Sequence, residues 1–155
     1  MAADSTSSLE RLDTFHDPDF VWTAPWIRAD ALAMFVAATS AVTFMDGSWS
    51  WFFGLFLLPD LSMAGYLFGS RAGAITYNTG HMIAWPLALL GIGLVTHRSL
   101  TTTAAFSWIA HIAFDHTVGY GVKLPTGFDH TTLGPIRRSR TARHMVDRAS
   151  PAAME

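Results

Sequence analysis

Four long apolar runs joined by short polar turns constrain the fold of this chain more than any other feature. The runs cover residues 29–45, 49–69, 72–96 and 100–120. Their lengths suit membrane-spanning helices, which need about 20 apolar residues to cross the hydrocarbon core of a bilayer. Backbone polar groups find no water in lipid, so such runs fold as helices. The sequence therefore predicts an all-α protein built as a four-helix transmembrane bundle.

Charged residues lie mainly outside these runs. They make up only 14% of the chain, against roughly 25% in a soluble domain. We divide the chain into a polar N-terminal tail with an interfacial tryptophan segment (1–28), a transmembrane domain (29–120), and a Gly/Pro loop with a basic tail (121–155). The arginines of this last tail are not interleaved with aromatic residues, so no nucleic-acid partner is expected. The chain has no cysteine, which excludes thiolate metal ligands.

The basic residues predict the orientation in the membrane. Four spans place both termini on one side, and nine of the ten lysines and arginines fall on that side. These nine are Arg11, Arg28, Arg71, Lys123, Arg137, Arg138, Arg140, Arg143 and Arg148. Arg98 alone falls on the other side. Because basic residues are retained in the cytoplasm, we expect a multi-pass protein with polar cytoplasmic tails.

Ionisable residues inside the apolar runs are the clearest indication of function. The stretch 108–116 carries His111, Asp115 and His116. A charged side chain in hydrocarbon costs several kcal/mol, so such residues face the protein interior and usually have a functional role. His111 and Asp115 are four residues apart and share one helix face, whereas His116 points about 100° away from Asp115.

Other runs place polar residues at the same depth. With a rise of roughly 1.5 Å per residue, Asp60, His81 and His111 each lie about nine residues, or roughly 14 Å, from the cytoplasmic ends of their helices. Asn78 and Tyr77 lie on the same helix face as His81, and Tyr66 lies below Asp60 toward the cytoplasm. These positions predict a polar site in the cytoplasmic half of the bundle.

Imidazole and carboxylate groups are suitable ligands for zinc, manganese or iron. The candidate metal ligands are His81, His111, Asp115 and Asp60. A divalent ion at such a site activates water for hydrolysis or stabilises an enolate-like intermediate. The leading interpretation is therefore a membrane-embedded, metal-dependent hydrolase or isomerase. Its partners would be membrane lipid and an apolar or amphipathic small molecule, within a homo-oligomer or as a subunit of a membrane complex.

Four residues are candidates for catalytic roles. They are Asp60, Tyr66, Asn78 and Lys123, with Tyr66 in the role of a general acid. Lys123 follows the fourth run directly, and two roles are open for it. Its long side chain either reaches lipid phosphate, as basic side chains near helix ends do, or closes the cytoplasmic mouth of the site and binds an anionic substrate group.

Two alternatives to an enzyme stay open. The same histidines and aspartates also suit a buried hydrogen-bond network that holds the helices together. His81 and His111 lie at matching depth on consecutive antiparallel helices, which is an arrangement that ligates haem axially, although the neighbouring carboxylates disfavour haem. In either case the chain would be a non-enzymatic membrane subunit or scaffold that binds a partner, a pigment or haem.

Three motifs occur in order along the apolar region. Residues 58–66 read LPDLSMAGY, residues 74–81 read AITYNTGH, and residues 111–123 end in GYGVK. Together they resemble a small bacterial membrane family, domain of unknown function 4260, over roughly residues 29–136. The resemblance implies a four-helix integral membrane protein, and with the charge pattern a bacterial inner-membrane location, but it implies no reaction. The chain departs from the family motif at His116 and has His130 displaced upstream, so no role is assigned to either histidine.

Overall fold

The structure is a computed structural model that describes residues 18–135. In order, the elements are α2 (Pro18–Phe44), α3 (Trp49–Phe56), the 3₁₀-helix η2 (Pro59–Phe68), α4 (Ser70–Gly80), α5 (Ala84–Val95), α6 (Ser99–Val118), and the short strands β1 (His130–Thr131) and β2 (Gly134–Pro135). The two strands pair antiparallel. Most of the predicted polar tails, including the C-terminal arginines, lies outside the described residues.

The predicted all-α, four-helix fold is confirmed, with α3 and η2 forming the second helical run and α4 and α5 the third. Three segments are long and apolar enough to cross a membrane: Thr23–Phe44, Trp49–Phe68 and Ser70–Val95. Large apolar side chains such as Val36 and Ile92 are exposed on their outer faces. These features indicate a multi-pass membrane protein.

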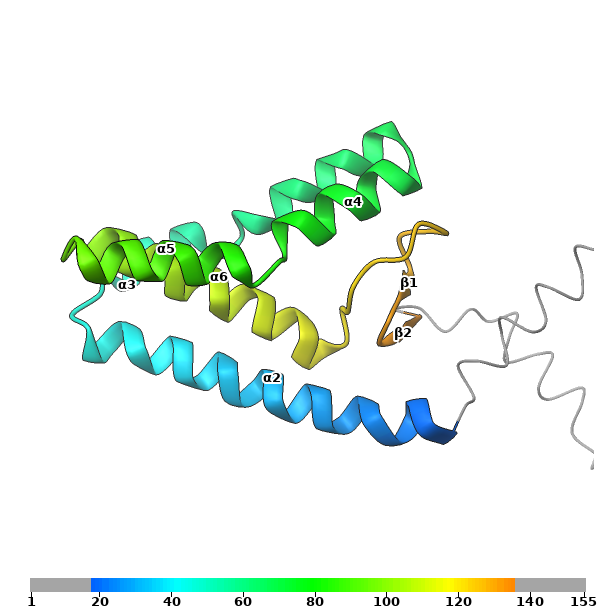
Figure 1. The fold of residues 1–155 in the computed structure, drawn as a ribbon, viewed down its shortest axis with the longest axis horizontal. Coiled ribbons are helices and arrows are strands. Elements are labelled where there is room, and N and C mark those ends of the chain that lie inside the picture. Colours follow the sequence, from blue (N-terminus) through cyan, green and yellow to red (C-terminus); the bar gives the residue numbers. More distant parts are fainter. Residues whose placement is uncertain (1–17, 136–155) are drawn as a thin grey trace, which may run out of the picture.

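The fourth run, α6, forms the centre of the bundle. It packs against α2, α3 and α5 (Figure 1). Its polar residues Thr102, Thr103 and Ser107 are buried there. Because the other helices cover it, α6 tolerates more polar side chains than the three segments that expose apolar surface.

The second and third apolar runs are each broken near the middle. The chain leaves α3 and resumes at Pro59 as η2, because a proline has no backbone N–H donor and interrupts an α-helix. The break between α4 and α5 is not evident from the apolar pattern. Pro86 lies in the first turn of α5, and its ring would clash with the carbonyl of Met82 if the helix were continuous.

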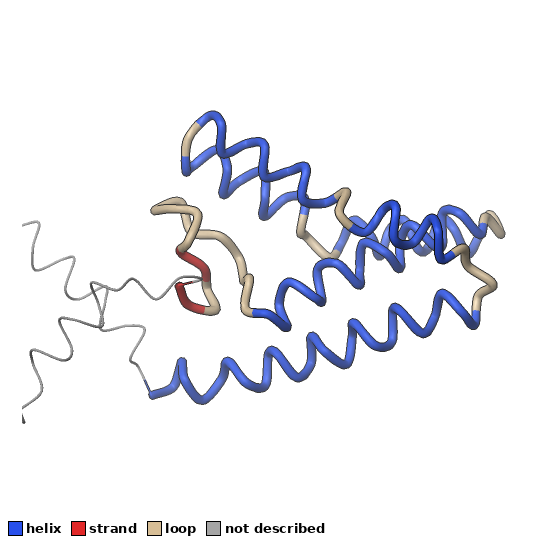
Figure 2. Tube along the Cα trace, turned by 180° about the vertical axis from the view of Figure 1, so that it is seen from behind, coloured by secondary structure: helices blue, strands red, loops and turns tan. Residues whose placement is uncertain are grey.

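Helices η2 and α4 are joined at the turn at Gly69 and pack closely together, and this pair is here named the hairpin. The hairpin diverges from α6 (Figures 1 and 2). Glycines allow the close approach. A Cβ at Gly65 would meet Thr76, and a Cβ at Gly73 would meet the ring of Tyr66. Small residues therefore allow the two helices to pack closely, as they commonly do in pairs of membrane helices.

The two ends of the described chain lie together. Helix α2 begins and α6 ends at the same end of the bundle, beside the strands, and the turn between α5 and α6 lies at the opposite end (Figure 1). This arrangement is the one expected for four antiparallel runs. Which side of the membrane each end faces stays a prediction.

Alanine substitutions at two glycines test the packing of the hairpin. Gly73→Ala places a methyl group against Tyr66, and overpacking of this kind costs about 1–3 kcal/mol. We expect a thermal unfolding midpoint several degrees below that of the wild type in detergent. Gly91→Ala is the matched control, because nothing lies within 4 Å of the added atom and loss of a helical glycine favours the helix. An unchanged midpoint for Gly73→Ala would contradict the close packing of η2 and α4.

Candidate metal centre

Four ionisable side chains from three parts of the chain converge in the membrane-spanning region. Asp60 follows Pro59 at the start of η2, His81 occupies the break after α4, and His111 and Asp115 lie on successive turns of α6. One donor atom from each lies within 4.8 Å of the other three. The two helix breaks therefore lie next to Asp60 and His81, the polar residues that meet α6.

The separations between these donor atoms suit a single metal ion. The Nε2 atoms of His81 and His111 are 3.1 Å apart. Oδ1 of Asp60 lies 3.4 Å from His111 Nε2 and 3.8 Å from His81 Nε2. Oδ2 of Asp115 lies 3.5 Å from His81 Nε2 and 3.9 Å from His111 Nε2. Ligands around a tetrahedral zinc with bonds of about 2.0–2.1 Å are about 3.3–3.4 Å apart, so the group could hold such an ion.

Tyr77 orients two of the four groups. Its backbone carbonyl accepts a hydrogen bond from Nδ1 of His81 at 2.9 Å, and its ring stacks on the imidazole with centres 3.8 Å apart. Its hydroxyl donates to Oδ2 of Asp115 at 2.6 Å. A carbonyl can only accept, so Nδ1 of His81 carries the proton and Nε2 is free to bind a metal. Tyr77 is absent from the predicted metal ligands and catalytic residues, although its position four residues before His81 is a signal for it.

His111 is the most enclosed of the four. Its side chain is 2% exposed and lies edge-on to the ring of Phe56, 5.2 Å between centres. Its Nδ1 has no hydrogen-bond partner within the described residues. With no ion bound, a proton on Nε2 can be donated to His81 or Asp60. The same atoms thus form the hydrogen-bond network that the sequence leaves open as an alternative.

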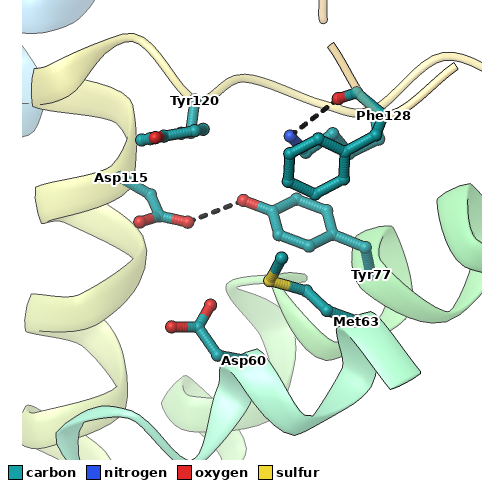
Figure 3. A pocket seen from close by; sticks show the side chains of 7 residues that line it. Asp60, Met63, Tyr77, Asp115, Tyr120 and Phe128 are labelled. Atoms are coloured by element: carbon teal, nitrogen blue, oxygen red, sulfur yellow. Dashed lines mark hydrogen bonds between the residues drawn. The ribbon is translucent and has the colours of Figure 1, made fainter. Parts of the chain in front are cut away.

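A cavity of about 220 Å³ adjoins the centre on the side of Asp60, whose side chain is 37% exposed. Its lining residues are Asp60, Met63, Tyr77, Asp115, Tyr120, Lys123 and Phe128 (Figure 3). Asp60 and Met63 both reach it because residues three apart share a face of a 3₁₀-helix. The cavity therefore gives a small molecule access to the two candidate carboxylate ligands.

Residues 119–135, here named the strap, close one side of this cavity and contribute Tyr120, Lys123 and Phe128. The strap runs between the end of α6 and the hairpin (Figure 2). Asn78 anchors it: its Nδ2 donates to the carbonyl of Lys123 at 2.9 Å, and its Oδ1 accepts from the Lys123 amide at 2.8 Å. Both polar atoms of the Asn78 side chain therefore bind the strap, and a catalytic role for Asn78 stays a prediction.

Two further predicted residues occupy different surroundings. Lys123 lines the cavity, and its ammonium donates to the carbonyl of Phe128 at 3.0 Å. Tyr66 does not line the cavity. Its ring packs edge-on against Phe128, 5.2 Å between centres, and its buried hydroxyl has no partner in the described part of the chain. The catalytic roles of these residues stay predictions, and the geometry gives no support to Tyr66 as a general acid.

The fold and this centre define a multi-pass membrane protein with a His/Asp group that could hold a metal. The family model described as Domain of unknown function (DUF4260) matches residues 24–136, and the chain belongs to this family, as its motifs predict. Searches of curated proteins and of solved structures found no match. The family description assigns no activity, so any functional argument must come from the site itself.

The anchoring role of Asn78 can be tested by hydrogen exchange. Asn78→Ala removes both hydrogen bonds to the Lys123 backbone, and we expect the Lys123 amide to exchange about 10- to 100-fold faster. The control is Thr79→Ala, because the Thr79 hydroxyl is exposed and bonds only the Ile75 carbonyl in its own helix. Equal exchange of the Lys123 amide in both variants would refute the anchoring role.

Proposed function

We propose that this protein is a membrane-embedded, metal-dependent hydrolase or isomerase that acts on a lipid or another apolar small molecule. The observation that carries the proposal is the set of four donor atoms within 4.8 Å of one another. Two aspartates and two histidines at one level exceed what helix packing requires, since a hydrogen bond between membrane helices contributes only about 0.6 kcal/mol.

The spacing of the donors favours zinc over manganese or iron. Adjacent ligands of an octahedral ion with bonds of about 2.1 Å lie about 3.0 Å apart, and four of the five separations given above exceed 3.3 Å. The 3.1 Å between the two imidazole nitrogens is also shorter than the roughly 4 Å that two opposite bonds to a haem iron require. The haem alternative is therefore disfavoured.

A bound divalent ion supplies Lewis-acid chemistry, because it polarises a carbonyl or phosphoryl oxygen and lowers the pKa of water. The residues of the chain then have separate tasks. His111 and His81 hold neutral nitrogens toward the ion, and Tyr77 fixes the orientation of His81 and Asp115. With the other three groups as ligands, one position on the ion would stay open, and Asp60, the most exposed of the four, would be free to accept a proton from a molecule in the cavity.

The position of the centre supports an apolar or amphipathic substrate. Asp60 and His81 lie inside the candidate spans Trp49–Phe68 and Ser70–Val95, whose outer faces are apolar. A molecule that reaches the cavity from the bilayer needs no passage through water. The distribution of basic residues supports a cytoplasmic location for this end of the bundle and for both termini, in a bacterial inner membrane.

Metal analysis tests the centre directly. We expect about one divalent ion per chain in protein purified in detergent with zinc supplied. His111→Ala and Asp115→Asn remove ligands and should lower this content at least tenfold, since metal sites lose affinity steeply when a ligand is lost. His116→Ala is the matched control, because it removes a histidine of the same helix that lies outside the four groups. No ion in the wild type, or equal content in His111→Ala, would leave the hydrogen-bond network as the better interpretation.

Activity is tested separately on membrane lipids. Metal-loaded protein is incubated with a total bacterial lipid extract, and products are followed by mass spectrometry. We expect one lipid class to be converted by the wild type and by His116→Ala, and conversion to stop with chelator or with His111→Ala. Conversion that persists with chelator present would contradict a metal-dependent reaction.

A further inference from the structure

Lys123 has an unusual environment for a charged side chain. It is the only lysine in the chain and is 2% exposed. Its ammonium lies 4.0 Å from the ring centre of Phe128 and 5.1 Å from those of Tyr77 and Tyr120. An ammonium has three donors, and its hydrogen bond to the Phe128 carbonyl uses one of them. The ion pairs found in residues 18–135 all involve His81 or His111, so no carboxylate pairs with this lysine there.

Burying an unpaired cation costs free energy, because the rings replace only part of its hydration. Burial accordingly lowers the pKa of Lys123 below its usual value of 10.5, while Asp115 and Asp129 act in the opposite direction. A sequence that needed only a packed strap could place methionine here. Independently of the side chain, Asn78 binds the backbone of Lys123 and so connects the strap to α4.

The charge of the whole cavity points to an anion. Its charged lining residues are Asp60, Asp115 and Lys123. In the proposed metal-bound state the two carboxylates balance the divalent ion, and the charge of Lys123 remains. The cavity then carries one net positive charge in surroundings that screen charge poorly. A ligand with a single negative charge would neutralise it.

The size and walls of the cavity restrict that ligand further. A volume of about 220 Å³ is below the roughly 300–1,000 Å³ of pockets that enclose drug-sized molecules, so it takes a headgroup and leaves long chains outside. Met63, Tyr120 and Phe128 provide apolar surface beside the ammonium. Figure 3 shows the Phe128 and Tyr77 rings on one side of the cavity and the carboxylates of Asp60 and Asp115 on the other.

From these observations we infer that Lys123 is a binding residue for the anionic headgroup of an amphipathic substrate, either a phosphodiester or a carboxylate. One oxygen of the headgroup accepts from the free donors of the Lys123 ammonium, and the rest of it lies toward Asp60 and the candidate metal centre. This inference rests on the proposed metal site. It narrows the substrate from any apolar molecule to one with a single negative charge next to an apolar chain.

Binding measurements on zinc-loaded protein in neutral detergent test this inference. The probes are a short-chain phosphatidylglycerol, octanoate, the neutral octanol and inorganic phosphate. Each is titrated by calorimetry, and the amphiphiles are kept below their critical micelle concentrations. We expect at least one of the two anionic amphiphiles to bind the wild type and octanol not to bind. Lys123→Met should weaken binding of the anion about 10- to 100-fold, as expected when a charged hydrogen-bond donor is lost. Arg71→Met is the matched control, since it removes one exposed positive charge outside the cavity.

The zinc content and unfolding midpoint of each variant are measured on the same samples. Undiminished anion binding by Lys123→Met would overturn the inference, and so would equal binding of octanol and octanoate. If the wild type binds zinc in the same samples, the proposed metal site is still supported. Inorganic phosphate that binds as tightly as the amphiphiles would also overturn the inference, because the apolar chain would then contribute nothing. Absence of zinc from the wild type would refute the metal site itself, and with it the charge balance used here.

A second measurement needs no variant and covers the case in which Lys123→Met does not fold. Because the chain has one lysine, growth on ε-¹⁵N-lysine labels the Lys123 side-chain nitrogen alone and leaves its three donors intact. In folded, zinc-loaded wild type we expect the Lys123 ¹⁵Nζ signal to shift on addition of the bound anionic amphiphile. A Lys123 signal that does not move at saturating anion would contradict direct contact.

Discussion

A helix that breaks inside a membrane leaves backbone carbonyl groups that lipid cannot satisfy, and this requirement shapes the structure around the site. Two of the apolar runs break, and side chains on α6 or at the breaks meet the freed carbonyls. Trp108 donates to the carbonyl of Gly80 at 2.9 Å, and Ser107 donates to that of Phe52 at 2.7 Å. His81 donates to the carbonyl of Tyr77. This carbonyl also accepts from the backbone amide of His81, so the side-chain bond adds to the helical one, and it fixes the tautomer of a candidate ligand.

Tyr77 connects this backbone requirement to the chemistry of the site. One residue supplies a carbonyl for His81, an aromatic face for the same imidazole, and a hydroxyl for Asp115. Its ring also borders the cavity next to the Lys123 ammonium. The candidate metal centre, the break after α4 and the anion-binding cavity thus share one side chain, so the three are expected to change together when Tyr77 is altered.

Much of this arrangement is predictable from the sequence because helix rise is fixed and the turns are short. Counting residues from the helix ends places Asp60, His81 and His111 at one depth, and the structure brings them together with Asp115. The counting assumes the rise of an α-helix, which does not hold in η2. In the 3₁₀-helix η2 the rise is about 2.0 Å per residue, so Tyr66 lies about 12 Å along the axis from Asp60 instead of about 9 Å. The path of the strap depends on its contacts with Asn78 and Tyr66, which no periodic pattern reveals.

The central position of α6 has a consequence for biosynthesis. The three segments apolar enough to cross a membrane by composition precede it in the chain, so they leave the ribosome first. Helix α6 carries His111 and Asp115, and its buried threonines and serine gain little from lipid. It therefore enters a membrane in which its protein neighbours are already present, and insertion of the last helix and assembly of the site become one event.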